Sequence, residues 1–264
     1  MLFGPYDRYQ YAHPPLMEVI CQLRFPAILA IDANEPVDFQ EAIRQEFPRY
    51  SVHREQLPPK VVKKGTGTVL EPQKPVNNHS FISEDGRWKI NLTQNFIALS
   101  TVGYQRWEDF AARLDRPLAQ FIQIYRPAFF ERLGLRYLNA ISRRTLGLTD
   151  SLWDDLIQTK YLGILGEPDV EESEIAKCSV DVETPLVGGY RMKVHAGPGV
   201  LGGGRVKDNE IRFILDSDFS AADKISAEQV PEKLERMHQY AVCLFQGAIT
   251  KELHEAMGPT PMAE

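Results

Sequence analysis

The sequence predicts an α+β fold, a tandem pseudo-twofold duplication of one β-α-β3(4)-α unit with antiparallel sheets and helices on one face. Two similar tripeptides, Leu23-Arg24-Phe25 and Leu135-Arg136-Tyr137, lie 112 residues apart, each in an apolar, alternating run. Elements of the same type follow each tripeptide in the same order, as an internal repeat requires. Such a unit packs its helices on one face of its sheet and leaves the other face to water or to a partner.

The first unit, residues 1–132, opens with a strand over 19–25, where apolar and polar side chains alternate with a period of two. A helix is expected over 36–47. Pro36 suits a first helical turn, apolar side chains recur every four residues, and Pro48 ends the pattern.

Three further strands and a long helix complete the first unit. Asp85-Gly86 is a tight-turn signal because glycine tolerates positive φ, and it predicts a hairpin between strands over 80–84 and 87–93. Another strand follows over 96–101. Seven apolar side chains on one helical face predict a helix over 105–125.

The second unit, residues 133–264, repeats this order and begins with a strand over 133–142. Thr149-Asp150-Ser151 predicts the N-terminal cap of a helix. The remaining strands are expected over 180–183, 190–195 and 211–216. A long helix from about Ser226 closes the chain, with an apolar stripe along one side.

The two units differ in charge and are expected to fold together as one body. Residues 1–132 contain 16 basic and 15 acidic side chains and residues 133–264 contain 14 and 21, so the net charges are +1 and −7. The outline of the joined units resembles the TATA-binding-protein-like fold. This likeness is one of architecture and implies no function.

The composition is that of a globular protein, with 43% hydrophobic and 25% charged residues among 264 and a net charge of −6. No run of about 18 apolar residues exists to cross a bilayer, and the first eleven residues lack the apolar core of a secretory signal. Cys21, Cys178 and Cys243 lie far apart in apolar runs, which is typical of buried thiols rather than of a disulfide framework. We therefore expect a cytoplasmic protein without membrane association.

Short motifs along nearly the whole chain resemble a sporadically distributed, uncharacterised family of bacterial proteins. They are His13-Pro14-Pro15 with Glu18, Gln22-Leu23-Arg24-Phe25-Pro26, residues 96–101 with Tyr104 and Trp107-Glu108, Leu135-Arg136-Tyr137-Leu138-Asn139, and Phe245 with Ile249-Thr250 and Glu252. The resemblance implies a single co-folded unit of about this length. It implies no activity, because the motifs are typical of strand cores, caps and helix packing.

No pattern in the sequence predicts a catalytic, metal or cofactor site. A Gly-x-Ser-x-Gly elbow, a Cys-x-x-Cys pair and a His-x-x-x-His pair are all absent from the sequence. The glycine-rich stretch 197–205 lacks the Gly-Lys-Ser/Thr ending of a phosphate loop and leads into a strand, so a long hairpin connection is favoured over an anion cradle. The sequence therefore favours a protein that is not an enzyme.

Two pairs of acidic residues offer oxygen ligands to a divalent cation. Asp181 and Glu183 lie on one face of an expected strand, as do Asp216 and Asp218. The basic side chains expected on a neighbouring strand are Arg191, Lys193 and His195. Ion pairing across the hairpin is the favoured explanation for these carboxylates.

Two further features have both a structural and a functional interpretation. His238 lies in the last helix, where a general base would need a partner that the sequence does not identify, so a partly buried structural histidine is favoured. Residues 53–79 form a basic, proline-rich segment, interpreted as a mobile, solvated loop. Its cations suit phosphates, but it has few aromatic side chains for base stacking and the protein is acidic, so nucleic acid is disfavoured.

The candidate binding residues are polar side chains on the open face of the sheet, opposite the helices. They are Gln22, Arg24, Lys89, Asn91 and Arg136. Arg136 is the repeat equivalent of Arg24, and arginines related by a pseudo-twofold predict a docking surface for a protein or a small anionic ligand. Pairing with acidic neighbours is the structural alternative.

Three functions stay open at the level of sequence. The favoured one is a non-catalytic binding or adaptor protein in an accessory system such as phage defence, acting through the open sheet face or through segment 53–79. The second is an enzyme with dispersed site residues, for which a cleft near His238 or at Asp216 and Asp218 would be the evidence. The third is a nucleic-acid binder. A homodimer is compatible with all three, because the edge strands need covering.

Overall fold

The computed structural model describes residues 3–4, 7–56, 58–64, 67–202 and 208–262, which form an α+β fold with antiparallel sheets. In this part of the chain the large sheet has nine strands, namely β2 Leu16–Arg24, β3 Arg49–Glu55, β6 Val76–Ile82, β7 Trp88–Thr93, β8 Phe96–Thr101, β9 Phe130–Ile141, β10 Val180–Leu186, β11 Tyr190–Val200 and β12 Ile211–Ile225. Two small ribbons pair β1 Tyr9–Tyr11 with β13 Pro259–Pro261 and β4 Lys60–Lys64 with β5 Gly67–Glu71. The helices are α1 Leu29–Ala33, α2 Val37–Ile43, α3 Trp107–Tyr125, α4 Arg143–Leu146, α5 Trp153–Leu156, α6 Val230–Gln246 and α7 Lys251–Ala256.

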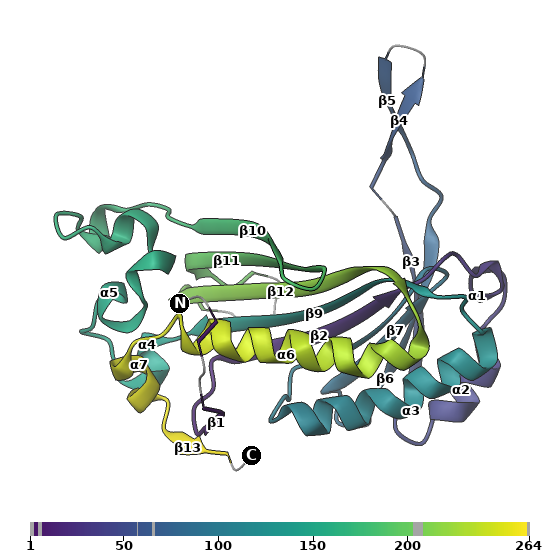
Figure 1. The fold of residues 1–264 in the computed structure, drawn as a ribbon, viewed down its shortest axis with the longest axis horizontal. Coiled ribbons are helices and arrows are strands. Elements are labelled where there is room, and N and C mark those ends of the chain that lie inside the picture. The colour runs from purple at the N-terminus through teal and green to yellow at the C-terminus, as the bar shows by residue number, and fades with distance from the viewer. Residues whose placement is uncertain (1–2, 5–6, 57, 65–66, 203–207, 263–264) are drawn as a thin grey trace.

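The strands of the large sheet lie in the order β10-β11-β12-β9-β2-β8-β7-β6-β3, and neighbouring strands are antiparallel. The two long helices, α3 and α6, cross the same face of this sheet (Figure 1). Because β2 pairs with β9, strands from the N-terminal and C-terminal parts of the chain join into one continuous sheet.

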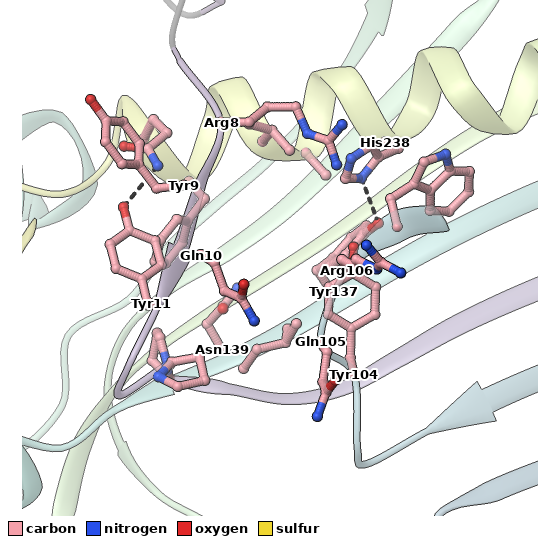
Figure 2. A pocket seen from close by; sticks show the side chains of 18 of the residues that line it. Arg8, Tyr9, Gln10, Tyr11, Tyr104, Gln105, Arg106, Tyr137, Asn139 and His238 are labelled. Atoms are coloured by element: carbon pink, nitrogen blue, oxygen red, sulfur yellow. Dashed lines mark hydrogen bonds between the residues drawn. The ribbon is translucent and has the colours of Figure 1, made fainter. Parts of the chain in front are cut away.

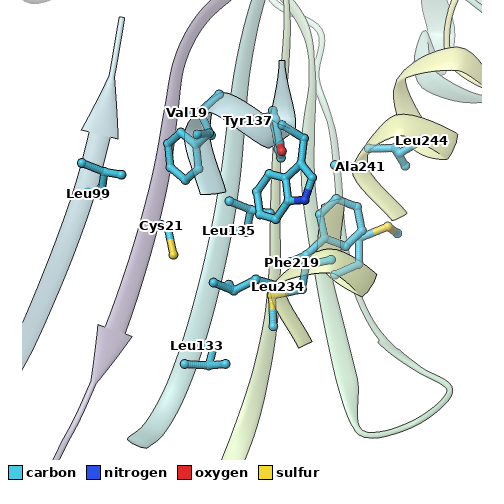
Figure 3. Packing of buried hydrophobic residues seen from close by; sticks show 14 of the residues in the cluster. Val19, Cys21, Leu99, Leu133, Leu135, Tyr137, Phe219, Leu234, Ala241 and Leu244 are labelled. Carbon is cyan, nitrogen blue, oxygen red and sulfur yellow. The ribbon is translucent and has the colours of Figure 1, made fainter. Parts of the chain in front are cut away.

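The core lies between the sheet and the long helices. Val19, Cys21 and Leu23 of β2 are fully buried, and their cross-strand neighbours Leu133 and Leu135 on β9 are buried as well. Figure 3 shows Val19, Cys21, Leu133 and Leu135 in one apolar layer with residues of α6. Burying each large apolar side chain contributes roughly 1.5–3 kcal/mol, so this shared layer joins the two parts of the chain energetically.

The ends of the two long helices follow from local sequence. Glu108 and Asp109 lie in the first turn of α3, where acidic side chains interact favourably with the helix dipole. Arg126 follows the last turn in the left-handed region, at φ 48°, and the next residue is a proline, which cannot continue the helix. The first turn of α6 contains Pro231, whose missing N–H group costs nothing there.

The predicted strands and long helices are present, and most of their ends are displaced by a few residues. Two strands are much longer than expected, since those predicted over 190–195 and 211–216 continue to Val200 and Ile225. The Asp85-Gly86 turn joins β6 to β7, with Gly86 at φ 72° as a tight turn requires. The predicted helix over 36–47 is shorter, because α2 ends at Ile43 and residues 44–46 form a turn. The final long helix begins at Val230 rather than at Ser226, which caps a preceding 3-10 turn over Ala227–Gln229.

The prediction of a loop over residues 53–79 is wrong. This segment contains the end of β3, the β4–β5 hairpin and the start of β6. Val61, Val62, Val69 and Leu70 favour extended backbone. Their preference outweighs that of the prolines, which indicated a loop. The hairpin projects from the body of the protein (Figure 1).

The predicted cap at Thr149-Asp150-Ser151 is also wrong. The helix that follows, α5, has a single turn, and its N-cap is Leu152, whose backbone N–H donates to the Asp155 carboxylate at 2.8 Å. The Ser151 hydroxyl donates instead to Glu252 at 2.9 Å, near the start of α7. A partner distant in sequence therefore replaces the local cap.

Two smaller expectations concern the cysteines and the glycine-rich stretch. The cysteines are free, but only Cys21 is fully buried, while Cys178 and Cys243 are half-buried. Of the glycine-rich stretch, expected to be a hairpin connection, residues 197–200 instead form the end of β11 and pair with β12, while residues 203–205 lie outside the described residues. Among the described helices, none is long and apolar enough to cross a membrane.

Candidate functional site

A cavity of about 410 Å³ lies between α6, the sheet and the N-terminal segment that contains β1 (Figure 2). Tyr137 and Asn139 of β9 and Ser217 of β12 line it from the sheet. The loop over residues 103–107, which leads into α3, supplies another wall. The cavity therefore depends on segments from both halves of the chain.

A chain of three hydrogen-bonded side chains borders the cavity. The hydroxyl group of Tyr137 lies 2.9 Å from Nδ1 of His238, and Tyr137 is also hydrogen-bonded to Tyr104. The three residues come from β9, α6 and the loop before α3, and Figure 2 shows them side by side. Nε2 of His238 is buried and has no hydrogen-bond partner among the described residues, which is rare in folded proteins.

Burial keeps the side chains of His238, Tyr104 and Tyr137 in their neutral forms. Desolvation lowers the pKa of His238 to about 3, with a smaller contribution from the positive charge of Arg8. The same cause raises the pKa of Tyr104 and Tyr137 well above the usual value for a phenol. At neutral pH these groups therefore act as neutral hydrogen-bond donors and acceptors.

Trp107 fixes the position of the histidine. Its indole ring stacks on the His238 ring, with centroids 4.7 Å apart and an interplanar angle of 7°. Its Nε1–H group donates to Glu235 on the exposed side of α6. This contact joins the start of α3 to α6 and holds the wall of the cavity in place.

The described residues that line the cavity include three arginines and no aspartate or glutamate. Arg8 forms an ion pair with Glu108 at 2.7 Å, and Arg106 forms one with Asp109 at 2.9 Å, both with carboxylates outside the cavity. Arg87 has no carboxylate within ion-pair distance among the described residues. Two of the three guanidinium charges are thus paired, and that of Arg87 acts on the carboxylate of Asp85, whose pKa is lowered mainly by a hydrogen bond from Ser83 and partly by this arginine.

Gly103 makes room for Arg87 in the lining of the cavity. A Cβ atom built on Gly103 would lie 3.0 Å from Cδ of Arg87, which is closer than nearly all real contacts. Any larger residue at this position would displace the arginine side chain.

Tyr11 holds the N-terminal segment over the C-terminal helices. Its hydroxyl group lies 2.9 Å from Nδ1 of His254 on α7 and accepts a hydrogen bond from Nε2 of Gln246 on α6 at 2.8 Å. Burial raises the pKa of Tyr11 to about 12, so the hydroxyl group stays neutral. The segment that closes one side of the cavity is therefore fixed by side-chain hydrogen bonds as well as by the β1–β13 ribbon.

The five residues predicted from sequence share one face of the sheet. The register places Gln22 next to Ala98, which in turn pairs with Asn91. A parallel row across the sheet contains Lys89, Ser100, Ile20 and Arg136. Strands are about 4.8 Å apart, so Lys89 and Arg136 are separated by roughly 14 Å, and the five residues do not line a common cavity.

Several of these side chains already have partners within the protein. Arg136 forms a two-pronged ion pair with Asp216, and Asn91 donates hydrogen bonds to Asn78 and Ser80 at 2.8 Å each. Arg24 is exposed and has no ion pair with any residue that the structure describes. Arg136 is thus paired with an acidic neighbour, which was the structural alternative to a docking surface.

The acidic pairs on the same face contact cross-strand partners. Asp181 lies 2.8 Å from His195, and Glu183 contacts both Arg191 and Lys193. These contacts confirm the predicted pairing across the hairpin. The second pair, Asp216 and Asp218, contacts two arginines of β9. Asp218 contacts Arg132 at 2.8 Å, and Asp216 contacts Arg136. No group of three or more potential metal ligands is found among the described residues.

Most residues of the cavity were not identified from sequence. His238 was singled out, but its partner Tyr137 is 101 positions away, and Arg8 and Arg87 gave no signal at all. The sequence indicates Tyr104 only through the family resemblance, and Trp107 through that resemblance and as part of the apolar face of the helix expected over 105–125. No spacing pattern connects these positions, because the fold alone brings them together.

A scan against models of known protein families found no match, and neither did a search of curated proteins. The resemblance to an uncharacterised bacterial family stays a prediction.

Proposed function

We propose that the protein is a non-catalytic binding protein whose ligand is a small organic anion with an apolar body. The observation that carries the proposal is a cavity of about 410 Å³ whose described lining has three arginines and no carboxylate. This volume lies within the range of pockets that enclose small ligands.

The distribution of polar and apolar groups supports an amphipathic ligand. Arginine side chains stay charged at every physiological pH and bind carboxylate, sulfonate or phosphate groups with paired hydrogen bonds. Among the described residues of the lining, Arg87 is the arginine without an internal ion pair, so we assign the ligand's anionic group to it. The apolar body would lie deeper, against Leu215, Ala241 and Leu244.

An enzyme is the second candidate, because a cavity does lie beside His238. A general acid or base works best when its pKa is near the operating pH. The pKa of His238 is about 3 and those of the two tyrosines are raised far above neutrality, so none of the three is suited to proton transfer at pH 7. The chemistry of the cavity therefore favours binding over catalysis.

We also propose that the chain consists of two duplicated units. Outward from the middle, the sheet order is β2-β8-β7-β6-β3 on one side and β9-β12-β11-β10 on the other, so the first series has an additional edge strand, β3. In the chain a long helix follows the last strand of each half, α3 after β8 and α6 after β12. Gln22 pairs with Gly134, and these positions differ by 112, the offset of the two tripeptides. A local twofold axis at this pair would relate the two units and place the cavity on one side of it.

The proposal is tested with a pair of matched probes in isothermal titration calorimetry. Naphthalene-2-sulfonate carries an anionic group on an apolar body, and naphthalene-2-sulfonamide is its neutral counterpart. We expect the anion to bind with one site per chain and more tightly than the sulfonamide. Arg87→Gln should weaken the anion about fivefold, equivalent to about 1 kcal/mol for an exposed charge pair, and leave the sulfonamide unchanged.

Two tryptophan variants on the same helix serve as a matched pair for location. Val242 lines the cavity, so Val242→Trp should fill it and abolish binding of both probes. Gln239 is exposed on α6 outside the lining, and Gln239→Trp should bind like the wild type. Equal affinity for both probes, or unchanged binding in Val242→Trp, would contradict the proposal.

A further inference from the structure

We propose that the β4–β5 hairpin docks on the acidic segment 150–174 of a second copy of this chain, forming a closed twofold dimer. The inference is independent of the ligand in the cavity. It rests on the shape, the exposed apolar side chains and the charge of two segments that lie far apart in one molecule.

The hairpin pairs only with itself among the described residues. Its two strands form a separate ribbon and extend away from the large sheet (Figure 1). Val61 and Leu70 are directly paired across the ribbon, and both are more than 60% exposed. An isolated two-stranded hairpin is marginally stable in water, and apolar side chains exposed in this way mark an interaction surface.

The hairpin and its stem are basic in an acidic protein. Residues 49–76 contain six Lys or Arg and two Glu, whereas the whole chain has a net charge of −6. Lys64 pairs with Glu71 at 2.6 Å. Lys60 and Lys63 are exposed and have no ion pair within the described part of the chain. The hairpin therefore carries uncompensated positive charge.

The segment 150–174 has the complementary properties. It contains eight acidic side chains and one lysine, so it accounts for the net charge of −7 in the second half of the chain. Glu167, Asp169, Glu171 and Glu174 are exposed and lack ion pairs among the residues that the structure describes. Leu152 and Ile164, 50% and 55% exposed, give this segment an apolar component as well.

Figure 1 shows the acidic segment around α5 at one end of the molecule, whereas the β4–β5 hairpin projects across the longest axis from the other half, so the hairpin does not reach the acidic segment of its own chain. Two copies placed antiparallel would bring each hairpin to the acidic segment of the other. Such an arrangement uses the same contact twice and closes after two subunits, which is the commonest form of homo-oligomer.

Charge reversal tests the inference through rescue on mixing. The hairpin variant carries Lys60→Glu and Lys63→Glu, and the segment variant carries Glu167→Lys and Glu171→Lys. Each variant alone should be monomeric in light scattering after size-exclusion chromatography at low salt. An equimolar mixture should recover dimers, because the reversed hairpin meets the reversed segment at one contact and the native pair meets at the other.

A variant with Arg44→Glu and Lys224→Glu has the same change in net charge at exposed positions outside the hairpin, and it should stay dimeric. The wild-type dimer should also dissociate as salt rises from 50 mM to 500 mM, because opposite charges attract less when screened. A wild-type monomer at low salt overturns the inference. Binding of a mixed-sequence DNA duplex by that monomer, lost in the hairpin variant, would assign the hairpin to nucleic acid instead.

Discussion

The neutral state of His238 is the residue-level property with the clearest physical consequence. The ring is buried between Trp107 and Tyr137, and no carboxylate of the described residues forms a hydrogen bond with it. Protonation would place a positive charge in a site that excludes water, near the guanidinium group of Arg8. The folded protein therefore resists a protonation that the unfolded chain undergoes readily.

This difference predicts a pH-dependent stability. Between pH 6.5 and about 3 the unfolded chain binds a proton at position 238 that the folded protein does not bind, so folding stability falls as the pH falls. A full proton corresponds to about 1.4 kcal/mol per pH unit. In urea unfolding, the stability advantage of the wild type over His238→Gln should shrink by about 2.5 kcal/mol between pH 7 and pH 4.5.

The control for this measurement is His53→Gln, at an exposed position on β3. Its unfolding free energy should run parallel to that of the wild type over the same pH range. An advantage of the wild type over His238→Gln that stays constant between pH 7 and pH 4.5 would show that the ring is not held neutral.

Contacts between nearby residues were predictable from sequence, and contacts between distant residues were not. The pairing of Asp181 with His195 follows from a single hairpin, whose register depends on local alternation. The contact of Arg136 with Asp216 spans 80 positions and needs the order of the strands in the sheet. The hydrogen bond of Tyr137 with His238 also needs the packing of α6 on that sheet.

At the scale of elements, the β4–β5 hairpin is an appendage rather than part of the folded body. The backbone hydrogen bonds of β4 and β5 are formed between these two strands. The hairpin connects β3 to β6, and the adjoining strand residues Glu55 and Val76 are paired with each other. A two-residue Asn-Gly turn suits such a pair of adjacent strand ends.

We therefore expect that replacing residues 56–75 by Asn-Gly leaves the fold intact. The melting temperature, measured by circular dichroism, should change by less than about 4 °C, the shift that about 1 kcal/mol produces in a protein of this size. Binding of naphthalene-2-sulfonate should be unaffected, because the hairpin does not line the cavity. Loss of the cooperative transition would show that the hairpin supports the sheet.

Elements with strong periodicity were predicted best. Alternation predicts strands at β2, β8 and β9, and apolar stripes predict helices at α3 and α6. The fold contains the same elements at these places. The hairpin was missed because its prolines and lysines indicated a loop, although its valines favour strands. The cap of α5 was misplaced because Ser151 bonds to Glu252, which is close only after folding.

At the scale of the whole molecule, the cavity exists because two halves of one sheet carry α3 and α6 side by side. Trp107 begins α3 and stacks on His238 of α6, while the N-terminal segment closes one side through Tyr11. No single element contains the site, so its position was not predictable from local patterns. The predicted α+β class was correct. The five predicted binding residues lie on the open face of the sheet, whereas the cavity lies on the face that the helices cover.

The most direct test of the account is a crystal structure of the wild-type protein with naphthalene-2-sulfonate. We expect the naphthalene ring in the cavity beside Tyr104 and Tyr137, with the sulfonate within hydrogen-bond distance of Arg87. A cavity without the probe, with the anion instead on the open sheet face at Arg24, would contradict the account and favour the surface indicated by the sequence.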